Sequence, residues 1–196
     1  MLADRSVIPV STHEDNTAIV RLLKPSVLVD ARMRKRAEPE TQRHLAPLTI
    51  GLGPNFIAGA TVHLVIETSW EAPGDVIEDG AARPLSGEPR AIAGHQRDRY
   101  VYAPTSGMFR TPYGIGDAVN QGTTIAWIGG AAIDAPLTGV LRGITRDGVP
   151  VDTGTKIVEV DPRGEAAMLT GLGERPMLIS EGVRKAIQMT RNGKGA

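Results

Sequence analysis

The chain has 196 residues, of which 41% are hydrophobic and 22% are charged. Its 22 Lys and Arg residues equal its 22 Asp and Glu residues, which excludes a global attraction to nucleic acid or to an anionic membrane. The lack of cysteine excludes disulfides, thiolate metal sites, iron–sulfur ligation and cysteine nucleophiles. No apolar run approaches the roughly 20 residues of a bilayer span, and no signal-peptide core follows Met1, so we expect a cytoplasmic protein.

The first part of the chain predicts a strand, a helix and a second strand. Residues 6–10 are a short apolar run, and Ser11 and Thr12 are suited to cap a helix. Apolar residues at helical spacing then continue until Pro25. The apolar run 27–29 ends at Asp30, as a buried parallel strand would. This order is half of a nucleotide-binding fold, so we expect a partial Rossmann-like α/β domain over residues 1–94.

A basic run follows the strand predicted before Asp30. Arg32, Arg34, Lys35 and Arg36 place four cations within five residues. Open α/β sheets bind ligands at the carboxyl ends of their parallel strands, and guanidinium groups suit phosphates. The run therefore indicates either an anion-binding loop, with Asp30 at its start, or a solvated basic loop. The sequence leaves both interpretations open.

A glycine-rich segment follows the next apolar run, at residues 48–56. It is not a dinucleotide fingerprint, because the third glycine and the following helix of that motif are missing. Free backbone amides in such a loop still suit a phosphate. We therefore count Gly51, Gly53 and Asn55 with the basic run as candidate cofactor-binding residues.

Residues 61–67 predict a strand that places His63 and Glu67 on one face. A histidine and a carboxylate on one face can share a metal ion or a proton, which makes the two residues candidate catalytic groups. The competing interpretation is a hydrogen-bonded pair beside a core. Residues 72–94 are rich in Pro and Gly and predict turns, so we place a domain boundary between about Gly87 and Arg97.

The second half of the chain contains an internal duplication. Residues 103–110 return as residues 135–142, and six further matches keep the same spacing of 32 residues, as between Gly116 and Gly148. Frequent Pro and Gly with short apolar runs predict a small all-β sandwich or barrel over residues 95–163. Residues 164–196 predict a C-terminal extension with a short helix that begins near Ser180.

The duplicated pattern resembles the barrel-sandwich hybrid of biotinyl and lipoyl carrier domains. The shared features are Ala-Pro-x-x-Gly and a later Gly-x-x-Val-x-x-Gly in each copy. In those domains a hairpin after the first copy carries a modifiable lysine. Here residues 129–132 read Gly-Gly-Ala-Ala, so we expect no attachment of biotin or lipoate.

The chain as a whole resembles the accessory proteins of the selenium-dependent molybdenum hydroxylase system over about residues 27–187. The resemblance is carried by six blocks in a fixed order: residues 29–36, 50–56, 62–68, 103–107, 135–139 and 160–164. It implies a role in maturation or cofactor supply for molybdenum hydroxylases. Members usually begin with a glycine-rich strand, turn and helix of the nucleotide-binding type, which this chain lacks.

Three functions remain open at this stage. The first is a non-catalytic accessory protein that binds an anionic ligand, such as a molybdenum cofactor or a nucleotide, and whose partners are a molybdenum hydroxylase or other maturation proteins. The second is a small-molecule enzyme that uses His63 and Glu67. The third is a docking or carrier-like subunit, with exposed aromatic residues among Tyr100, Tyr102, Phe109 and Tyr113. We favour the first, expect no metal site, nucleic-acid partner or membrane partner, and leave homo-oligomerisation open.

Overall fold

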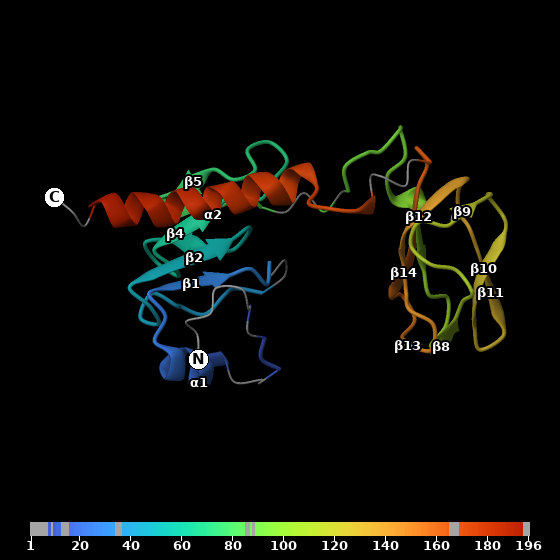
Figure 1. Cartoon of the computed structure of the whole chain (residues 1–196), viewed down its shortest axis with the longest axis horizontal. Helices are drawn as coiled ribbons and strands as arrows, with labels where there is room; N and C mark the ends of the chain where they lie inside the picture. Colours follow the sequence, from blue (N-terminus) through green and yellow to red (C-terminus); the bar gives the residue numbers. More distant parts are fainter. Residues whose placement is uncertain are drawn as a thin grey trace. The chain divides into compact units, whose positions relative to one another are not determined.

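The chain is a mixed α/β protein whose contacts divide it into two compact units. The computed structural model describes residues 8, 10–12, 16–33, 37–84, 87, 89–164 and 169–193. Unit 1 comprises Met1–Leu85 and Leu172–Ala196, and unit 2 comprises Ser86–Gly171 (Figure 1). The sequence predicted a domain boundary at residue 94 and a C-terminal extension over residues 164–196, whereas the contacts assign residues 172–196 to unit 1.

Unit 1 contains a four-stranded sheet with the order β1-β2-β4-β5. Three strands are parallel and the fourth, β5, is antiparallel to β4. The strands are β1 (Val27–Asp30), β2 (Leu48–Leu52), β4 (Leu64–Ile66) and β5 (Val76–Ile77). A separate antiparallel pair joins β3 (Ile57–Ala58) to β6 (Gly80–Ala81). All five residues of the central strand β2 are buried, as an apolar strand within a parallel sheet requires.

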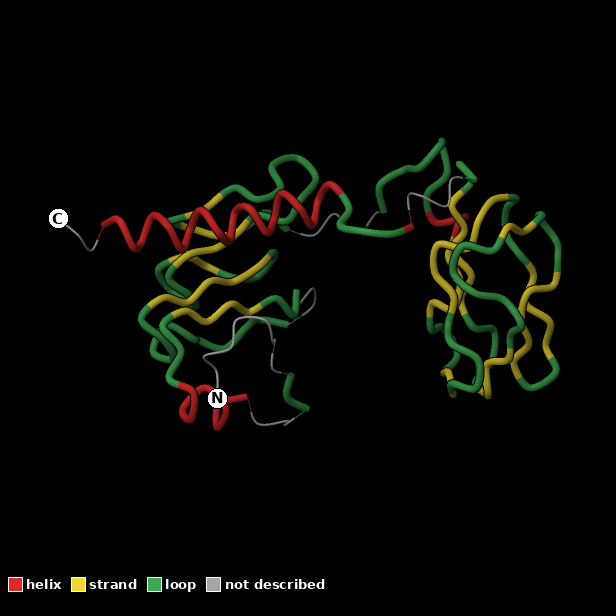
Figure 2. The backbone as a smooth tube through the Cα atoms, in the orientation of Figure 1, coloured by secondary structure: helices red, strands yellow, loops and turns green. Residues whose placement is uncertain are grey.

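Two helices belong to unit 1, α1 (Asn16–Leu23) and α2 (Glu174–Gly193). The sequence predicted a short helix from about residue 180, but α2 begins six residues earlier. Pro176 is compatible with this early start, because the amide that proline lacks is unpaired in the first turn of any helix. Ala186 is fully buried against the sheet, and Figure 2 shows the long helix α2 lying beside the strands of unit 1.

Close backbone contact holds α2 against the loop before β5. A Cβ atom on Gly182 would lie 2.2 Å from the carbonyl oxygen of Gly74, and a Cβ on Gly74 would lie 2.2 Å from that of Leu178. Only glycine at positions 74 and 182 permits this approach.

Among the described residues, no helix is long and apolar enough to cross a membrane.

Unit 2 consists of two antiparallel four-stranded sheets that share one core, with the short 3-10 helix η1 (Arg97–Arg99) before them. The first sheet has the order β7 (Tyr100–Tyr102), β14 (Lys156–Asp161), β12 (Gly139–Ile144) and β9 (Ala118–Val119). The second has the order β11 (Ala131–Asp134), β10 (Thr124–Ile128), β8 (Gly107–Arg110) and β13 (Pro150–Val151). Its core contains Phe109, which the sequence analysis had placed among exposed aromatics; this prediction was wrong, because the side chain faces inward and is fully buried.

The duplicated sequence corresponds to repeated structure. Strands β8, β9 and β10 of the first copy match β12, β13 and β14 of the second. The middle strand of each copy pairs in the other copy's sheet, since β9 joins β12 and β13 joins β8. Matched apolar positions are buried in both copies, as with Ile125 and Ile157. Each copy therefore completes the other's sheet, and neither would form a sandwich alone.

A two-residue turn without a lysine joins β10 to β11. Gly129 and Gly130 occupy the turn with φ angles of 53° and 92°. A positive φ at both central residues is the mark of a type I′ turn, which suits the twist of a tight hairpin and favours glycine. The adjacent residues Ala131 and Ala132 already belong to β11.

Candidate functional site

Asp30 and Arg32 form a closed ion pair at the carboxyl end of β1. One carboxylate oxygen of Asp30, Oδ1, accepts from the backbone N–H of Arg32 at 3.1 Å and from its Nε at 2.9 Å. The other oxygen, Oδ2, accepts from Nη2 of Arg32 and from Nε2 of Gln42 at 2.7 Å. The Asp30 side chain is only 3% exposed, whereas that of Arg32 is 46% exposed. The buried carboxylate therefore fixes the orientation of a guanidinium that still faces solvent.

The electrostatics of this pair depend on a second carboxylate. Burial on its own would raise the pKa of Asp30, but the hydrogen bonds from Arg32 and Gln42 outweigh it and lower the pKa to about 2. Glu40 lies 3.3 Å from Nη2 of Arg32 and is 57% exposed. Two carboxylates thus share one guanidinium, and Glu40 is the partner that solvent or an anion can replace.

The glycine-rich segment packs closely at the same edge of the sheet. A Cβ on Gly51 would lie 2.3 Å from the Phe56 ring, so this glycine makes room for a core aromatic. Gly53 has a φ of 86° and faces Oγ1 of Thr68, which would lie 2.7 Å from an added Cβ. These packing roles explain both glycines without a ligand.

Asn55 connects the loop after β2 to the loop after β1. Its φ is 72°, a left-handed conformation that asparagine tolerates better than most residues. Its side-chain amide donates to the carbonyl oxygen of Ala37 at 3.4 Å. The two loops predicted to bind a ligand are therefore neighbours in the structure.

His63 is held by Thr49 of the neighbouring strand, close to the start of β4. Its Nδ1 accepts from the backbone N–H of Thr49 at 3.1 Å and lies 2.9 Å from the hydroxyl oxygen. The backbone N–H of His63 donates to the same hydroxyl at 3.0 Å. Because Nδ1 is an acceptor, these contacts assign the proton of a neutral ring to Nε2.

Glu67 lies at the opposite end of β4 and organises the turn that follows. Its Oε1 accepts from the backbone amides of Thr68 at 2.6 Å and Ser69 at 2.7 Å, and its Oε2 accepts from the amide of Arg83 at 2.8 Å. His63 and Glu67 are four extended residues apart, roughly 13 Å, and have different partners. Among the described residues, no group of three or more His, Asp or Glu side chains is placed to hold a metal ion.

The predicted residues gather in part. Asp30 is the last residue of β1, Arg32, Gly53 and Asn55 lie in loops at the same carboxyl edge of the sheet, and Glu67 directly follows β4. His63 lies at the other end of β4. Three of the predicted cations, Arg34, Lys35 and Arg36, fall outside the described residues, as does most of the predicted strand at 6–10.

Sequence reasoning missed Gln42 and Glu40, which complete the Asp30–Arg32 cluster. Gln42 is 3% exposed, and its side-chain amide donates a hydrogen bond to Asp30, which lies 12 positions earlier in the chain. A lone buried glutamine between Pro39 and the apolar run 45–50 carries no periodic signal that would mark it. The polar pattern at 38–43 is typical of a solvated loop.

The chain is similar to a known protein over nearly its whole length. No protein-family model matches it. The chain is 41% identical over 191 residues to YqeB of Escherichia coli strain K12, which bears the description "uncharacterized protein". That alignment covers 96% of the chain but 35% of YqeB, so the chain spans about a third of the length of this relative.

Two solved structures share short segments with the chain. The product-bound ectoine utilization protein EutE (DoeB) of Ruegeria pomeroyi is 20% identical, with a TM-score of 0.27 over 33% of this chain and 22% of that one. The succinylglutamate desuccinylase/aspartoacylase of Rhodobacter sphaeroides is 25% identical, with a TM-score of 0.28 over 43% of this chain and 30% of that one. At such scores neither likeness assigns a fold or an activity.

Proposed function

We propose that this chain is a non-catalytic accessory protein in the maturation of a molybdenum hydroxylase, and that it binds an anionic cofactor or nucleotide at the carboxyl edge of the unit 1 sheet. The single observation that carries the proposal is the meeting of two loops there, joined by Asn55 and Ala37, beside the oriented guanidinium of Arg32. Ligands of open α/β sheets occupy this edge. In this role the partners of the chain would be the hydroxylase or other maturation proteins.

The finer fold assignment belongs to the same proposal. The parallel order of β1, β2 and β4 supports a partial Rossmann-like domain in unit 1. The exchange of β9 and β13 between two matched halves supports a barrel-sandwich hybrid of the biotinyl and lipoyl type in unit 2, without the attachment lysine. On this assignment unit 2 has a structural or docking role.

Arg32 would bind a phosphate through the side of its guanidinium that Asp30 leaves free. Its Nε and Nη2 are engaged by Asp30, and within the described residues no hydrogen bond is formed by Nη1. An incoming phosphate would replace Glu40 at Nη2 and add a contact at Nη1. Asp30 would then act as a positioning residue, because it holds the guanidinium plane in place before the ligand arrives.

Isothermal titration calorimetry with ADP and with inorganic pyrophosphate at low salt tests the proposal. We expect binding by the unaltered chain and a loss of about tenfold in affinity for Arg32→Gln, since one charge-assisted hydrogen-bonding group is removed. Arg163→Gln is the matched control, because it removes a cation from the corresponding Asp–Arg pair in unit 2. Failure of the unaltered chain to bind either probe would refute the ligand assignment.

A docking role for unit 2 is the second candidate, and it is favoured by an exposed apolar pair. Trp127 on β10 is 41% exposed and Met108 on β8 is 43% exposed, although both lie within a sheet. Exposed Trp and Met side chains are enriched where proteins meet. Co-elution of the chain with a co-expressed molybdenum hydroxylase, lost in Trp127→Ser but kept in Trp70→Ser, would support this role; equal co-elution of all three proteins would contradict it.

A further inference from the structure

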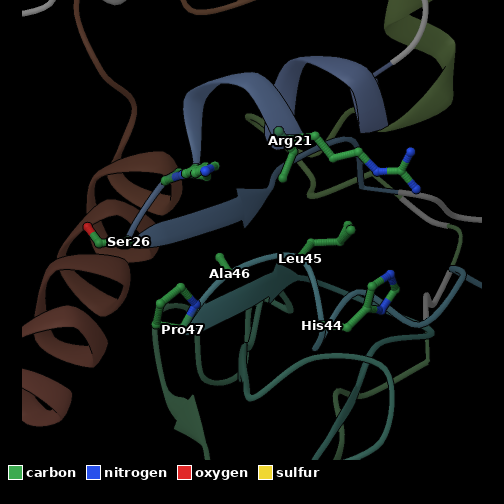
Figure 3. Close-up of a pocket in the computed structure, with 9 residues that line it drawn as sticks. Arg21, Ser26, His44, Leu45, Ala46 and Pro47 are labelled. Atoms are coloured by element: carbon green, nitrogen blue, oxygen red, sulfur yellow. The ribbon is translucent and has the colours of Figure 1, made fainter.

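A pocket of about 850 Å³ lies in unit 1, at the opposite end of β1 from Asp30. One wall comes from the last turn of α1 and its exit, and the other from the segment that leads into β2. The lining residues are Val20, Arg21, Lys24, Pro25, Ser26, His44, Leu45, Ala46 and Pro47. Figure 3 shows Arg21 and His44 toward one end of the pocket and Ser26 and Pro47 toward the other. Four extended residues, roughly 13 Å, separate Ser26 from Asp30, so the pocket is distinct from the carboxyl edge.

The charge around this pocket is one-sided. Arg21, Lys24 and His44 supply basic side chains, and no carboxylate is among the lining residues that the structure describes. Within the described part of the chain, none of these three side chains forms an ion pair or a hydrogen bond. Arg32 and Arg83 of the same unit are each held by a carboxylate. The pocket therefore collects basic groups that have no carboxylate partner among the described residues of unit 1.

The backbone at Lys24 has a left-handed conformation at the end of α1. Its φ is 44°, and its N–H closes the end of α1 by donating to the carbonyl oxygen of Val20 at 2.9 Å. Glycine is the usual residue at such a left-handed helix end, since other residues are strained there. Lys24 is also one of the residues that line the pocket, and residues in strained conformations cluster at ligand sites.

We propose that the pocket binds an amphipathic organic anion. This proposal does not depend on the ligand site proposed at the carboxyl edge of the sheet. Its apolar or aromatic body would lie against Val20, Pro25 and Leu45. Its phosphate or carboxylate group would lie between Arg21 and Lys24 of one wall and His44 of the other. Mixed lining of this kind, mostly apolar with a few convergent polar groups, is typical of small-molecule sites.

Nuclear magnetic resonance titration of the ¹⁵N-labelled chain tests the proposal with two probes of the same shape. Anilinonaphthalene sulfonate carries an anionic group, and N-phenylnaphthylamine is its neutral counterpart. We expect saturable shifts of the backbone amides of residues 20–24, 26, 44–46 and 48 with the anionic probe, and much weaker shifts with the neutral one. Competition by inorganic phosphate or by acetate then identifies the preferred anionic group, and competition by neither would count against an anion site.

Paired variants separate the pocket from general charge effects. The double variant Arg21→Gln/Lys24→Gln should bind the sulfonate about tenfold more weakly, because two exposed cation contacts are lost. Arg146→Gln/Lys185→Gln removes the same net charge outside the pocket and should bind as the unaltered chain does. Unchanged amide shifts elsewhere confirm that each variant is folded. Equal shifts with both probes, or equal affinity of both double variants, would overturn the proposal, whatever the outcome at Arg32.

Discussion

Each of the two units has an Asp-x-Arg sequence at the end of a strand, and in each the aspartate and arginine side chains form a hydrogen-bonded ion pair. At the end of β14, the Asp161 carboxylate accepts from the backbone N–H of Arg163 at 3.1 Å, from its Nε at 3.0 Å and from its Nη2 at 2.7 Å. Asp30 and Arg32 at the end of β1 use the same atoms. An aspartate that bonds the amide two residues later is a common turn motif, so the shared geometry is local in origin.

The two pairs differ in their third charged partner. Arg32 has a second carboxylate, Glu40, at 3.3 Å, whereas Asp161 has a second guanidinium, that of Arg142, at 3.5 Å. The pair at β1 therefore gains a second carboxylate, whereas the pair at β14 gains a second guanidinium, which also lies 3.6 Å from Glu159. An Asp-x-Arg sequence therefore predicts the ion pair. It does not predict the electrostatic environment of the pair, which is set by residues distant in sequence.

Breaking the more deeply buried pair should have the largest effect. Asp161 is fully buried, and hydrogen bonds from Arg163 hold its pKa below the usual value although burial opposes them. Asp161→Asn would remove the carboxylate that binds Arg163 and would leave Arg142 with Glu159 alone, and we expect it to destabilise unit 2 by about 3 kcal/mol. Urea unfolding followed by Trp127 fluorescence, in a Trp70→Phe background, measures this unit alone, since each unit has one tryptophan. A loss below about 1 kcal/mol would contradict the prediction.

The corresponding change in unit 1 should cost less and should depend on pH. The pKa of Asp30 falls from 3.8 to about 2 on folding, a difference that corresponds to about 2 kcal/mol. Because the folded-state pKa is the lower one, this stabilisation is complete above about pH 4 and is lost as the pH falls toward 2. Asp30→Asn should therefore destabilise unit 1 by about 2 kcal/mol at pH 7 and have little effect near pH 2. Urea unfolding monitored by Trp70 in a Trp127→Phe background gives both values.

The sequence was informative where a pattern is local or repeated. The run Val27–Val29 ends in a parallel strand at Asp30, and the 32-residue spacing corresponds to matched strands in unit 2. It was uninformative where a partner is remote, as with Gln42 and Asp30. Glycines were ambiguous for a different reason: Gly51 suggested a phosphate loop, yet the structure uses it to accommodate the Phe56 ring. A glycine can make room either for a ligand or for a core side chain. Only the contacts in the structure distinguish these two roles.

The smallest expected effect on stability is also the most direct test of how the two clusters differ. Glu40 is 57% exposed, so its ion pair with Arg32 is screened, and Glu40→Gln should change the stability of unit 1 by less than about 0.5 kcal/mol. Its effect on ligand binding should be larger, because removal of the competing carboxylate leaves Arg32 with Asp30 alone.

We expect Glu40→Gln to raise the affinity for inorganic pyrophosphate about threefold at low salt, with the gain disappearing at high salt as screening increases. Asp147→Gln is the matched control, since Asp147 is an exposed carboxylate paired with Arg110 in unit 2 at 3.4 Å. Equal gains in both variants would mean that only net charge matters. A gain confined to Glu40→Gln, and absent from the double variant Arg32→Gln/Glu40→Gln, would locate the anion at Arg32.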